Sequence, residues 1–124
     1  MYSLTSRYQQ GQQVEELVNK YLQQQGLTII TRNFRSAFGE IDIISQEGTS
    51  LVFVEDRYRR NYDFGGPIAS VTRHKQKKIL RTAECYISKR KWTNKLTKRF
   101  DVLGVTGAEK TKFEWIKDAI YYEY

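Results

Sequence analysis

The stretch from Gly39 to Arg60 constrains the fold most, because it places acids inside and directly after two apolar, β-forming runs. The first run, residues 41–44, is interrupted by Asp42, and the second, residues 51–54, is followed by Glu55 and Asp56. Residues 47–50 contain a glycine and suit a four-residue hairpin loop. The pattern therefore predicts a β-hairpin in which residue 46 lies opposite residue 51.

Extended along both strands, this register sets Asp42 opposite Glu55 and Glu40 opposite Arg57. Directly opposed side chains of an antiparallel pair lie roughly 4.5–5.5 Å apart at Cβ, where two like charges destabilise the sheet. A divalent cation such as Mg²⁺ would remove that repulsion, since it binds carboxylates together with water and phosphate oxygens. A surface hairpin whose acids simply face water is the alternative interpretation.

The composition is that of one globular domain, because 124 residues with 40% hydrophobic residues can form a core. We expect residues 1–10 to be a flexible lead-in and residues 11–124 to form the domain. No apolar run approaches the roughly 20 residues of a membrane span, and the N-terminus lacks an apolar signal-peptide core, so we expect a cytoplasmic protein with no membrane partner. Cys85 and His74 are the only residues of their kinds, which argues against cysteine- or histidine-based metal chemistry.

Positive charge is concentrated in one part of the chain. Residues 57–99 contain 14 Lys or Arg and only two acids, whereas the rest of the chain contains 7 basic and 12 acidic residues. A concentrated basic region predicts a polyanionic partner, and nucleic acid is the commonest one. A basic face that only keeps the protein in solution is the alternative.

An amphipathic helix is predicted from Gly11 to about Gly26, with apolar residues at helical spacing: Val14, Leu17, Val18, Tyr21 and Leu22. Glu15 falls at the edge of this stripe and can reach into the domain; an acid that only favours the helix dipole is the alternative. Strands at residues 27–33, 99–106 and 112–116 complete the order α-β-β-β-α-β-β. This order predicts an α/β domain with a mixed central β-sheet flanked by helices.

A second helix is predicted from an N-cap at Thr72 to about Arg90, with a buried stripe of Ile79, Leu80, Ala83, Tyr86 and Ile87. Its outward side carries Cys85, expected as an exposed thiol, and the cationic or titratable residues Arg73 (at the margin), His74, Lys77, Lys78 and Arg81. Lys75 and Gln76 project toward the apolar side near the helix start. Either residue can serve a site at that end of the helix. The alternative is that Lys75 extends its ammonium group to solvent and that Gln76 is an amide with its hydrogen bonds satisfied.

These residues carry a resemblance to a known family. The sequence resembles the YraN-like family of predicted endonucleases, which is distantly similar to archaeal Holliday-junction resolvases and belongs to the PD-(D/E)xK, restriction-endonuclease-like superfamily. The resemblance covers residues 11–119, and its markers are Glu15, Arg32-Asn33, residues 39–44, residues 51–55, residues 64–67, Lys75, residues 99–101 and residues 115–119. It implies a restriction-endonuclease-like single domain.

The resemblance also implies a Mg²⁺- or Mn²⁺-dependent nuclease that acts on DNA, including branched repair or recombination intermediates. Asp42 and Glu55 match the metal-binding acids, Glu15 matches the additional acid of the first helix, and Arg57 stands where most of the superfamily has lysine. The expected phosphate- and DNA-binding residues are Lys75, Arg59, Arg60, Arg73, Lys77, Lys78 and Arg81, with Glu40 and Gln76 as accessory residues. Tyr58, Tyr62 and Trp92 are available for stacking on bases, and packing within the protein is the alternative for these aromatic residues. A homodimer is expected by analogy with the resolvases.

Two residues depart from the general pattern. Arg57 stays protonated and cannot act as a base, so a nucleic-acid-binding module that cleaves weakly or not at all is the alternative to a nuclease. An interaction protein with an acidic partner is a third possibility. Asp56 stands where the family usually has an apolar residue, on the strand face of Val52 and Val54. Because a buried, unpaired carboxylate would be expensive, we expect Asp56 near solvent at the strand end or beside a basic partner.

Overall fold

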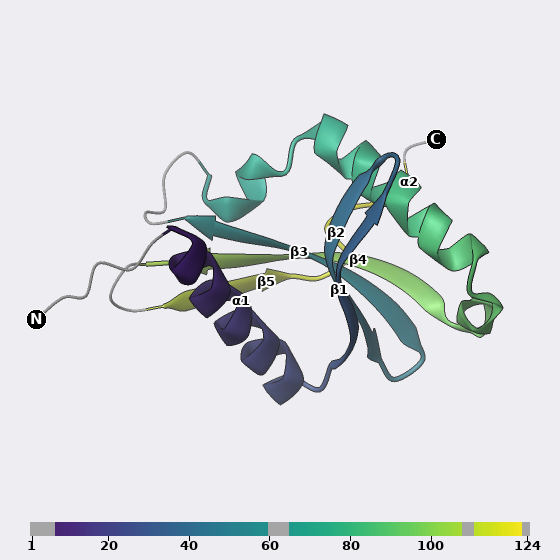
Figure 1. The fold of residues 1–124 in the computed structure, drawn as a ribbon, viewed down its shortest axis with the longest axis horizontal. Helices are drawn as coiled ribbons and strands as arrows, with labels where there is room; N and C mark the ends of the chain where they lie inside the picture. The colour runs from purple at the N-terminus through teal and green to yellow at the C-terminus, as the bar shows by residue number, and fades with distance from the viewer. Residues whose placement is uncertain (1–6, 60–64, 108–110, 123–124) are drawn as a thin grey trace, which may run out of the picture.

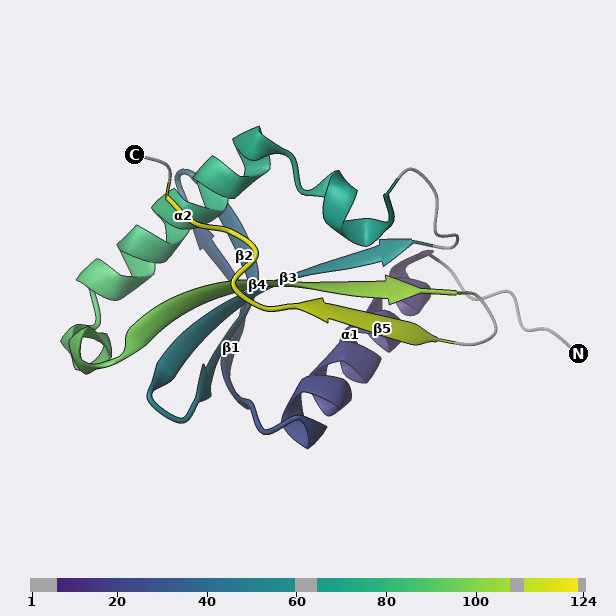
Figure 2. The same cartoon turned by 180° about the vertical axis from the view of Figure 1, so that it is seen from behind.

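A five-stranded sheet forms the centre of the molecule, with one α-helix packed on each face (Figures 1 and 2). The computed structural model describes residues 7–59, 65–107 and 111–122. In chain order the elements are α1 (Arg7–Gln24), β1 (Thr28–Ser36), β2 (Gly39–Glu47), β3 (Ser50–Arg59), the 3₁₀ helix η1 (Pro67–Ser70), α2 (Arg73–Ser88), the 3₁₀ helix η2 (Lys91–Lys95), β4 (Thr97–Thr106) and β5 (Lys112–Ile116). The predicted α/β class and the order of helices and strands are confirmed.

The sheet is mixed, as predicted, and its strands follow the chain order β1-β2-β3-β4-β5. The pairs β1–β2, β2–β3 and β4–β5 are antiparallel, whereas β3 and β4 are parallel. A parallel pair needs a crossover connection, and here α2 supplies it.

Neither α-helix in the described ranges is long and apolar enough to cross a membrane.

The two sheet faces are buried under different helices, because strand residues alternate between faces. Leu51 and Phe53 of β3 join the core cluster that contains Ile79 and Leu80 of α2. Val52 and Val54, together with Val18 and Leu22 of α1, belong to the second cluster. Odd-numbered residues of β3 therefore face α2, and even-numbered residues face α1.

The central hairpin has the predicted register, since Gln46 pairs with Leu51, but its turn is shorter than predicted. Glu47 and Ser50 also pair, so only Gly48 and Thr49 form the turn. Gly48 adopts φ +57°, which a two-residue hairpin turn requires and glycine adopts without strain. The prediction of a four-residue loop was wrong by one residue on each side.

The first helix begins at Arg7, so residues 7–10, predicted as part of a flexible lead-in, belong to α1. Of the predicted apolar stripe on this helix, Val18 and Leu22 are fully buried, but Leu17 stays 43% exposed because it lies at the margin of the contact with the sheet. The predicted N-cap of α2 is confirmed: the Thr72 hydroxyl accepts a hydrogen bond from the backbone N–H of Lys75 at 3.3 Å.

Asp101 of β4 anchors the chain after β5 to the sheet. Its fully buried carboxylate accepts hydrogen bonds from Arg99 (Nε to Oδ1, 3.0 Å; Nη2 to Oδ2, 2.9 Å), from the Trp115 indole (2.9 Å) and from the backbone N–H of Asp118 (2.9 Å). The sequence markers at residues 99–101 and 115–118 thus meet in one polar network. Beyond it the chain places Ile120 in the core on the α2 side.

Candidate metal and phosphate site

The acids of the hairpin meet where β2 separates from β3. The last pair of the β2–β3 ladder is Ile43 with Val54, and β2 then continues beside β1 alone. Ile41 and Ile43 pack into different core clusters, so the strand alternation of β2 breaks at the residue between them, Asp42. At this fork the Asp42 carboxylate accepts the backbone N–H of Asp56 at 3.0 Å.

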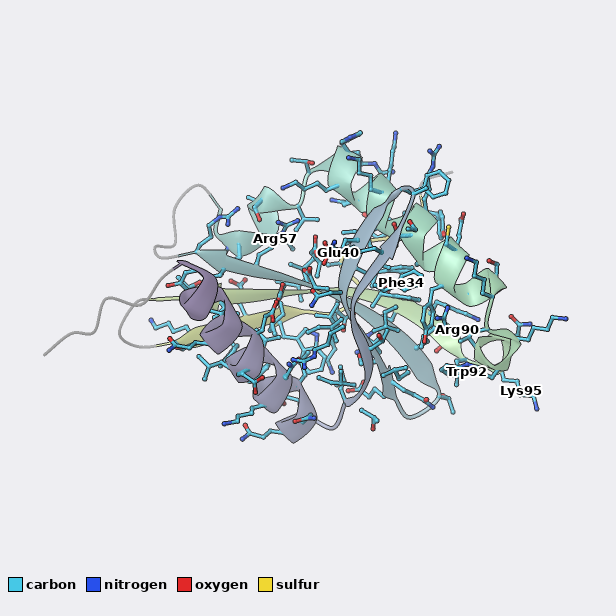
Figure 3. All side chains as sticks on the ribbon, viewed as in Figure 1. Phe34, Glu40, Arg57, Arg90, Trp92 and Lys95 are labelled. Carbon is cyan, nitrogen blue, oxygen red and sulfur yellow. The ribbon has the colours of Figure 1, made fainter. Side chains whose placement is uncertain are left out.

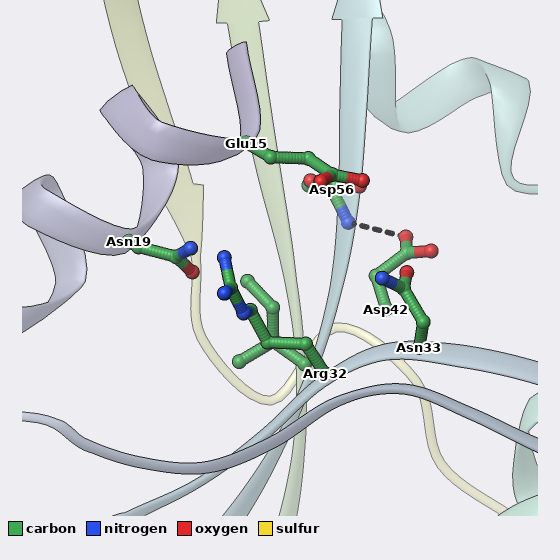
Figure 4. A pocket seen from close by; sticks show the side chains of 7 residues that line it. Glu15, Asn19, Arg32, Asn33, Asp42 and Asp56 are labelled. Atoms are coloured by element: carbon green, nitrogen blue, oxygen red, sulfur yellow. Dashed lines mark hydrogen bonds between the residues drawn. The ribbon is translucent and has the colours of Figure 1, made fainter. Parts of the chain in front are cut away.

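A small pocket opens at the fork on the α1 side (Figure 4). Its cavity volume is about 20 Å³, room for about one water molecule. Helix α1 contributes Glu15 to the lining, and β3 contributes Asp56. The complete lining is Glu15, Asn19, Arg32, Asn33, Asp42, Ile43 and Asp56.

The fork raises the pKa of two carboxyls, those of Asp42 and Asp56. Burial, followed by interaction with the carboxyl of Glu55, raises the pKa of Asp42 to about 8. Burial, followed by the charge of Asp42, raises the pKa of Asp56 to about 8. The two carboxyls thus oppose each other's ionisation near neutral pH. A cation between them would reverse this effect, because an opposite charge favours the ionised form.

Glu55 is an odd-numbered residue of β3, like Leu51 and Phe53, so it approaches Asp42 from the α2 side of the sheet, whereas the pocket opens on the α1 side. It is buried, with 9% of its surface exposed, and its Oε2 accepts a 2.6 Å hydrogen bond from Arg57 Nη2. Within the described contacts the buried Arg57 Nε has no hydrogen-bond partner. The guanidinium therefore neutralises Glu55, while its Nε–H stays buried without a partner in the described residues.

The expected pairing of Glu40 with Arg57 is wrong. Because the β2–β3 ladder ends before Glu40, this acid lies opposite Arg35 of β1 and forms an exposed ion pair with it at 3.7 Å.

Gln76 is the satisfied amide that one interpretation predicted: its Nε2 donates to the Val71 carbonyl at 3.1 Å, and its Oε1 accepts from Arg73 at 3.4 Å.

The other predicted DNA-binding residues are distributed over a wider surface than the fork. Lys75, Lys77, Lys78 and Arg81 are exposed along α2. Arg59 is exposed at the end of β3, and Tyr58 donates its hydroxyl to the Gly107 carbonyl at 3.3 Å. Trp92 is half exposed beyond the C-terminal end of α2, away from Arg57 (Figure 3). Arg60 and Tyr62 lie outside the described residues. The prediction of an exposed Cys85 thiol was wrong, because this side chain is half-buried.

Asp56 meets the first of the two expectations for it, a position near solvent, only in part. The side chain is half-buried in the pocket, and within the described ranges it forms no ion pair; its neighbour Arg57 only lowers its pKa through charge. The carboxyl instead remains beside Asp42, with a pKa that favours the protonated form at neutral pH.

Asn19 is the pocket residue that sequence reasoning missed. It is only 8% exposed, and in the described part of the structure its buried Oδ1 has no hydrogen-bond partner. Asn19 could have been predicted from its position four residues after Glu15, because residues at this spacing lie on the same face of a helix. Asn33 also lines the pocket, and its φ of +54° is a conformation that asparagine tolerates better than most residues.

The described residues contain no group of three or more His, Cys, Asp or Glu side chains close enough to hold a metal ion by themselves. The fork offers two carboxylates, Asp42 and Glu55, in contact with each other, with Glu15 and Asp56 lining the adjoining pocket. A cation bound here would complete its ligand shell with water or substrate oxygens. This is the usual arrangement for Mg²⁺, which keeps several waters.

The fold and this site define a small mixed α/β protein with an acid-lined fork in its sheet and a basic second helix. The chain belongs to the family described as uncharacterised protein family UPF0102, whose family profile matches residues 14–105. It is 44% identical to a UPF0102 protein of Coxiella burnetii over 124 residues, which is all of both chains. It is 39% identical to a UPF0102 protein of Vibrio parahaemolyticus, over 94% of this chain and 96% of the relative. The predicted membership of the YraN-like family is thereby confirmed.

Proposed function

We propose that this protein is a divalent-metal-dependent nuclease-like protein of the restriction-endonuclease-like superfamily, acting on DNA. The observation that carries the proposal is the fork at Asp42, where this half-buried acid and the buried Glu55 lie beside an arginine, with a helix acid lining the same pocket as Asp42. Such a cluster is costly in a sheet that serves structure alone. The element order and mixed sheet agree with the superfamily, and the acids stand where its motif has metal ligands.

The residues at the fork fit Mg²⁺ or Mn²⁺. All the acidic donors are hard oxygens, which these cations prefer. Glu55 uses Oε2 for Arg57, so its second oxygen stays available beside Asp42. The unpartnered Oδ1 of Asn19 gives the pocket one more acceptor. Asp42 and Glu55 would hold the cation, with Glu15 acting directly or through water.

The side chains around the fork have distinct roles in phosphodiester hydrolysis. A divalent cation, when bound, supplies activation of water and neutralises charge on the phosphate. Arg57 keeps its proton and donates a guanidinium N–H that Glu55 does not use to a phosphate oxygen, which stabilises the charge that develops there. Its bond to Glu55 fixes the direction of the guanidinium. Lys75 contacts a second phosphate at the start of α2.

The exposed basic side of α2 binds the DNA backbone. Phosphate contacts position a protein without reading sequence, so binding is expected to depend on DNA shape and on salt. Branched DNA, including repair and recombination intermediates, is the proposed substrate class. The contributing side chains of α2 are Arg73, Lys77, Lys78 and Arg81, and Arg59 and Arg60 contribute from the end of β3 and the segment that follows it.

A catalytically weak DNA-binding module is the second candidate, and one observation favours it. The 2.6 Å contact of Arg57 with Glu55 neutralises the acid without a metal, and an arginine cannot serve as a general base. In that case the basic surface of α2 remains functional, whereas the fork binds a cation weakly.

Cleavage assays decide between these candidates. Purified protein is incubated with linear, forked and four-way DNA in Mg²⁺, Mn²⁺ or EDTA, beside the Asp42→Asn variant. The nuclease proposal expects metal-dependent products that the variant does not form. If wild type and Asp42→Asn give equal product while wild type still binds the DNA, the binding module is the correct function.

A further inference from the structure

A second, larger cavity lies away from the acid fork, between the tip of the β1–β2 hairpin and the exposed side of α2. Its volume is about 770 Å³, within the range of roughly 300–1,000 Å³ that ligand-binding pockets occupy. The hairpin contributes Ala37 and Phe38, and the chain after β5 contributes Tyr122. We call this cavity the tip groove; α2 lines it with His74, Lys77, Lys78, Leu80, Arg81 and Glu84.

The groove is a fixed feature, because the hairpin tip is held against α2 (Figures 1 and 2). Ser36 donates its hydroxyl hydrogen to Thr82 Oγ1 at 3.1 Å, and Thr82 is fully buried. Gly39 approaches α2 so closely that an added Cβ would lie 3.5 Å from the Cβ of Lys78. The hairpin tip is therefore packed on the helix and presents Phe38 at a defined place.

The groove combines exposed aromatic rings with positive charge. Phe38 is 45% exposed, and the Arg81 guanidinium lies 5.6 Å from its ring centroid. Tyr122 is 47% exposed, and its hydroxyl donates to Glu84 at 2.8 Å, so the acid of the groove already has a partner. The lysines and arginine then leave an excess of positive charge. Stacking surfaces within a cationic groove are what a nucleic-acid strand with unpaired bases requires.

We propose that the tip groove binds a single-stranded segment of DNA, with an unpaired base stacked on Phe38 and its phosphates beside the α2 cations. The inference rests on the proposed function and deepens it, because it names the part of a branched substrate that the protein recognises. Phe38 is four residues from Asp42 along the chain, a span of at most roughly 14 Å. Phe38 of the groove and Asp42 of the fork are therefore close enough to contact one branched DNA molecule.

Fluorescence anisotropy in EDTA tests the groove without cleavage. The probes are a labelled single strand, a blunt duplex of equal length, and a duplex with a single-stranded arm. Phe38→Ala is expected to weaken binding of the single strand and the armed duplex roughly tenfold, and to change blunt-duplex binding less than about twofold. Leu17→Ala, which removes a side chain of similar exposure on α1, is the matched control and should bind all three as wild type.

A charge pair and a spectroscopic readout complete the test. Lys77→Glu lies in the groove, whereas Lys20→Glu makes the same charge change on the exposed side of α1. Only Lys77→Glu is expected to weaken single-strand binding more than duplex binding. A fluorescent base analogue in the single strand should be quenched by stacking on Phe38 with wild type and not with Phe38→Ala.

Three results would overturn the inference. Equal losses on single strand and blunt duplex would show a general electrostatic surface, and no loss would show an unused groove. A Phe38→Ala variant that dissociates a dimer in sedimentation, while binding the single strand as wild type does, would show that a second copy fills the groove. Absence of cleavage would refute the nuclease proposal alone, since the anisotropy measurements contain no metal.

Discussion

Replacing Asp42 by asparagine should stabilise the protein in the absence of divalent metal, although it removes a site residue. The amide keeps an oxygen for the Asp56 N–H, so the 3.0 Å hydrogen bond at the fork is retained. What disappears is a carboxyl whose pKa in the folded state is raised from 3.8 to about 8. Stability gained by deleting a buried acid is the expected mark of a residue kept for function.

The sign follows from proton binding. Between about pH 4 and pH 8 the unfolded chain releases the Asp42 proton while the folded protein retains it, so the free energy of unfolding falls as pH rises. At about 1.4 kcal/mol per pH unit the upper limit is roughly 6 kcal/mol. Solvent at the half-exposed fork and the repulsion shared with Asp56 reduce this, so we expect about 2 kcal/mol near pH 8 and almost none below about pH 4.

Urea unfolding in EDTA at about pH 5 and about pH 8, followed by circular dichroism, measures this difference. Wild type should lose stability over the interval, and Asp42→Asn should lose about 2 kcal/mol less. Asp118→Asn is the matched control, because it removes an exposed acid at φ +56°, a conformation that asparagine tolerates. If Asp42→Asn unfolds more easily than wild type near pH 8, or has the same pH dependence, the repulsion inferred at the fork is absent.

Three further predictions concern the metal, the anchor and the basic helix. Millimolar Mg²⁺ should raise the free energy of unfolding of wild type near pH 8 by about 1–3 kcal/mol and leave Asp42→Asn unchanged; equal shifts in thermal melts would place the cation elsewhere. Asp101→Asn should cost about 2 kcal/mol in urea unfolding, because it removes the fully buried carboxylate from Arg99, which then keeps only its 3.0 Å ion pair with Glu47 among the described residues; a loss similar to that of Asp118→Asn would contradict the network. Lys78→Ala should weaken duplex binding and reduce the slope of log K against log salt by about 1; an unchanged slope would exclude a phosphate contact.

The sequence predicted the hairpin register correctly because alternating apolar residues permit only one pairing that buries both strands. The same rule of alternation failed at Asp42. It assumes that β2 stays paired with β3, whereas the ladder ends at Ile43 and Val54 and the strand follows β1. The separation depends on contacts of β2 with β1 and α2, which are distant in sequence. Glu40 was therefore assigned to Arg57 although it lies opposite Arg35.

The helices were predicted from their periodicity, and the error on α1 has a similar origin. Helical spacing places Leu17 and Val18 in one stripe, but only the packing against the sheet determines how wide the buried stripe is. On this helix it is narrow, so Leu17 is exposed while the polar Asn19 is buried in the pocket. A polar residue on the apolar side of a helix that also carries Glu15 is the signal that identifies the site.

The family markers separate into two groups when each carboxylate is judged by its partners. Asp101 is completely buried and accepts hydrogen bonds from one guanidinium, one indole and one backbone N–H, so its charge stabilises the folded state. Asp42 accepts one backbone N–H and otherwise faces other acids, so its charge opposes folding. The markers at residues 99–101 and 115–118 therefore belong to the fold, whereas the carboxylate of Asp42 is the one whose charge opposes folding. Loss of stability should follow substitution of Asp101, and also of Glu55 because it would leave the Arg57 guanidinium without its carboxylate, but not substitution of Asp42 by asparagine.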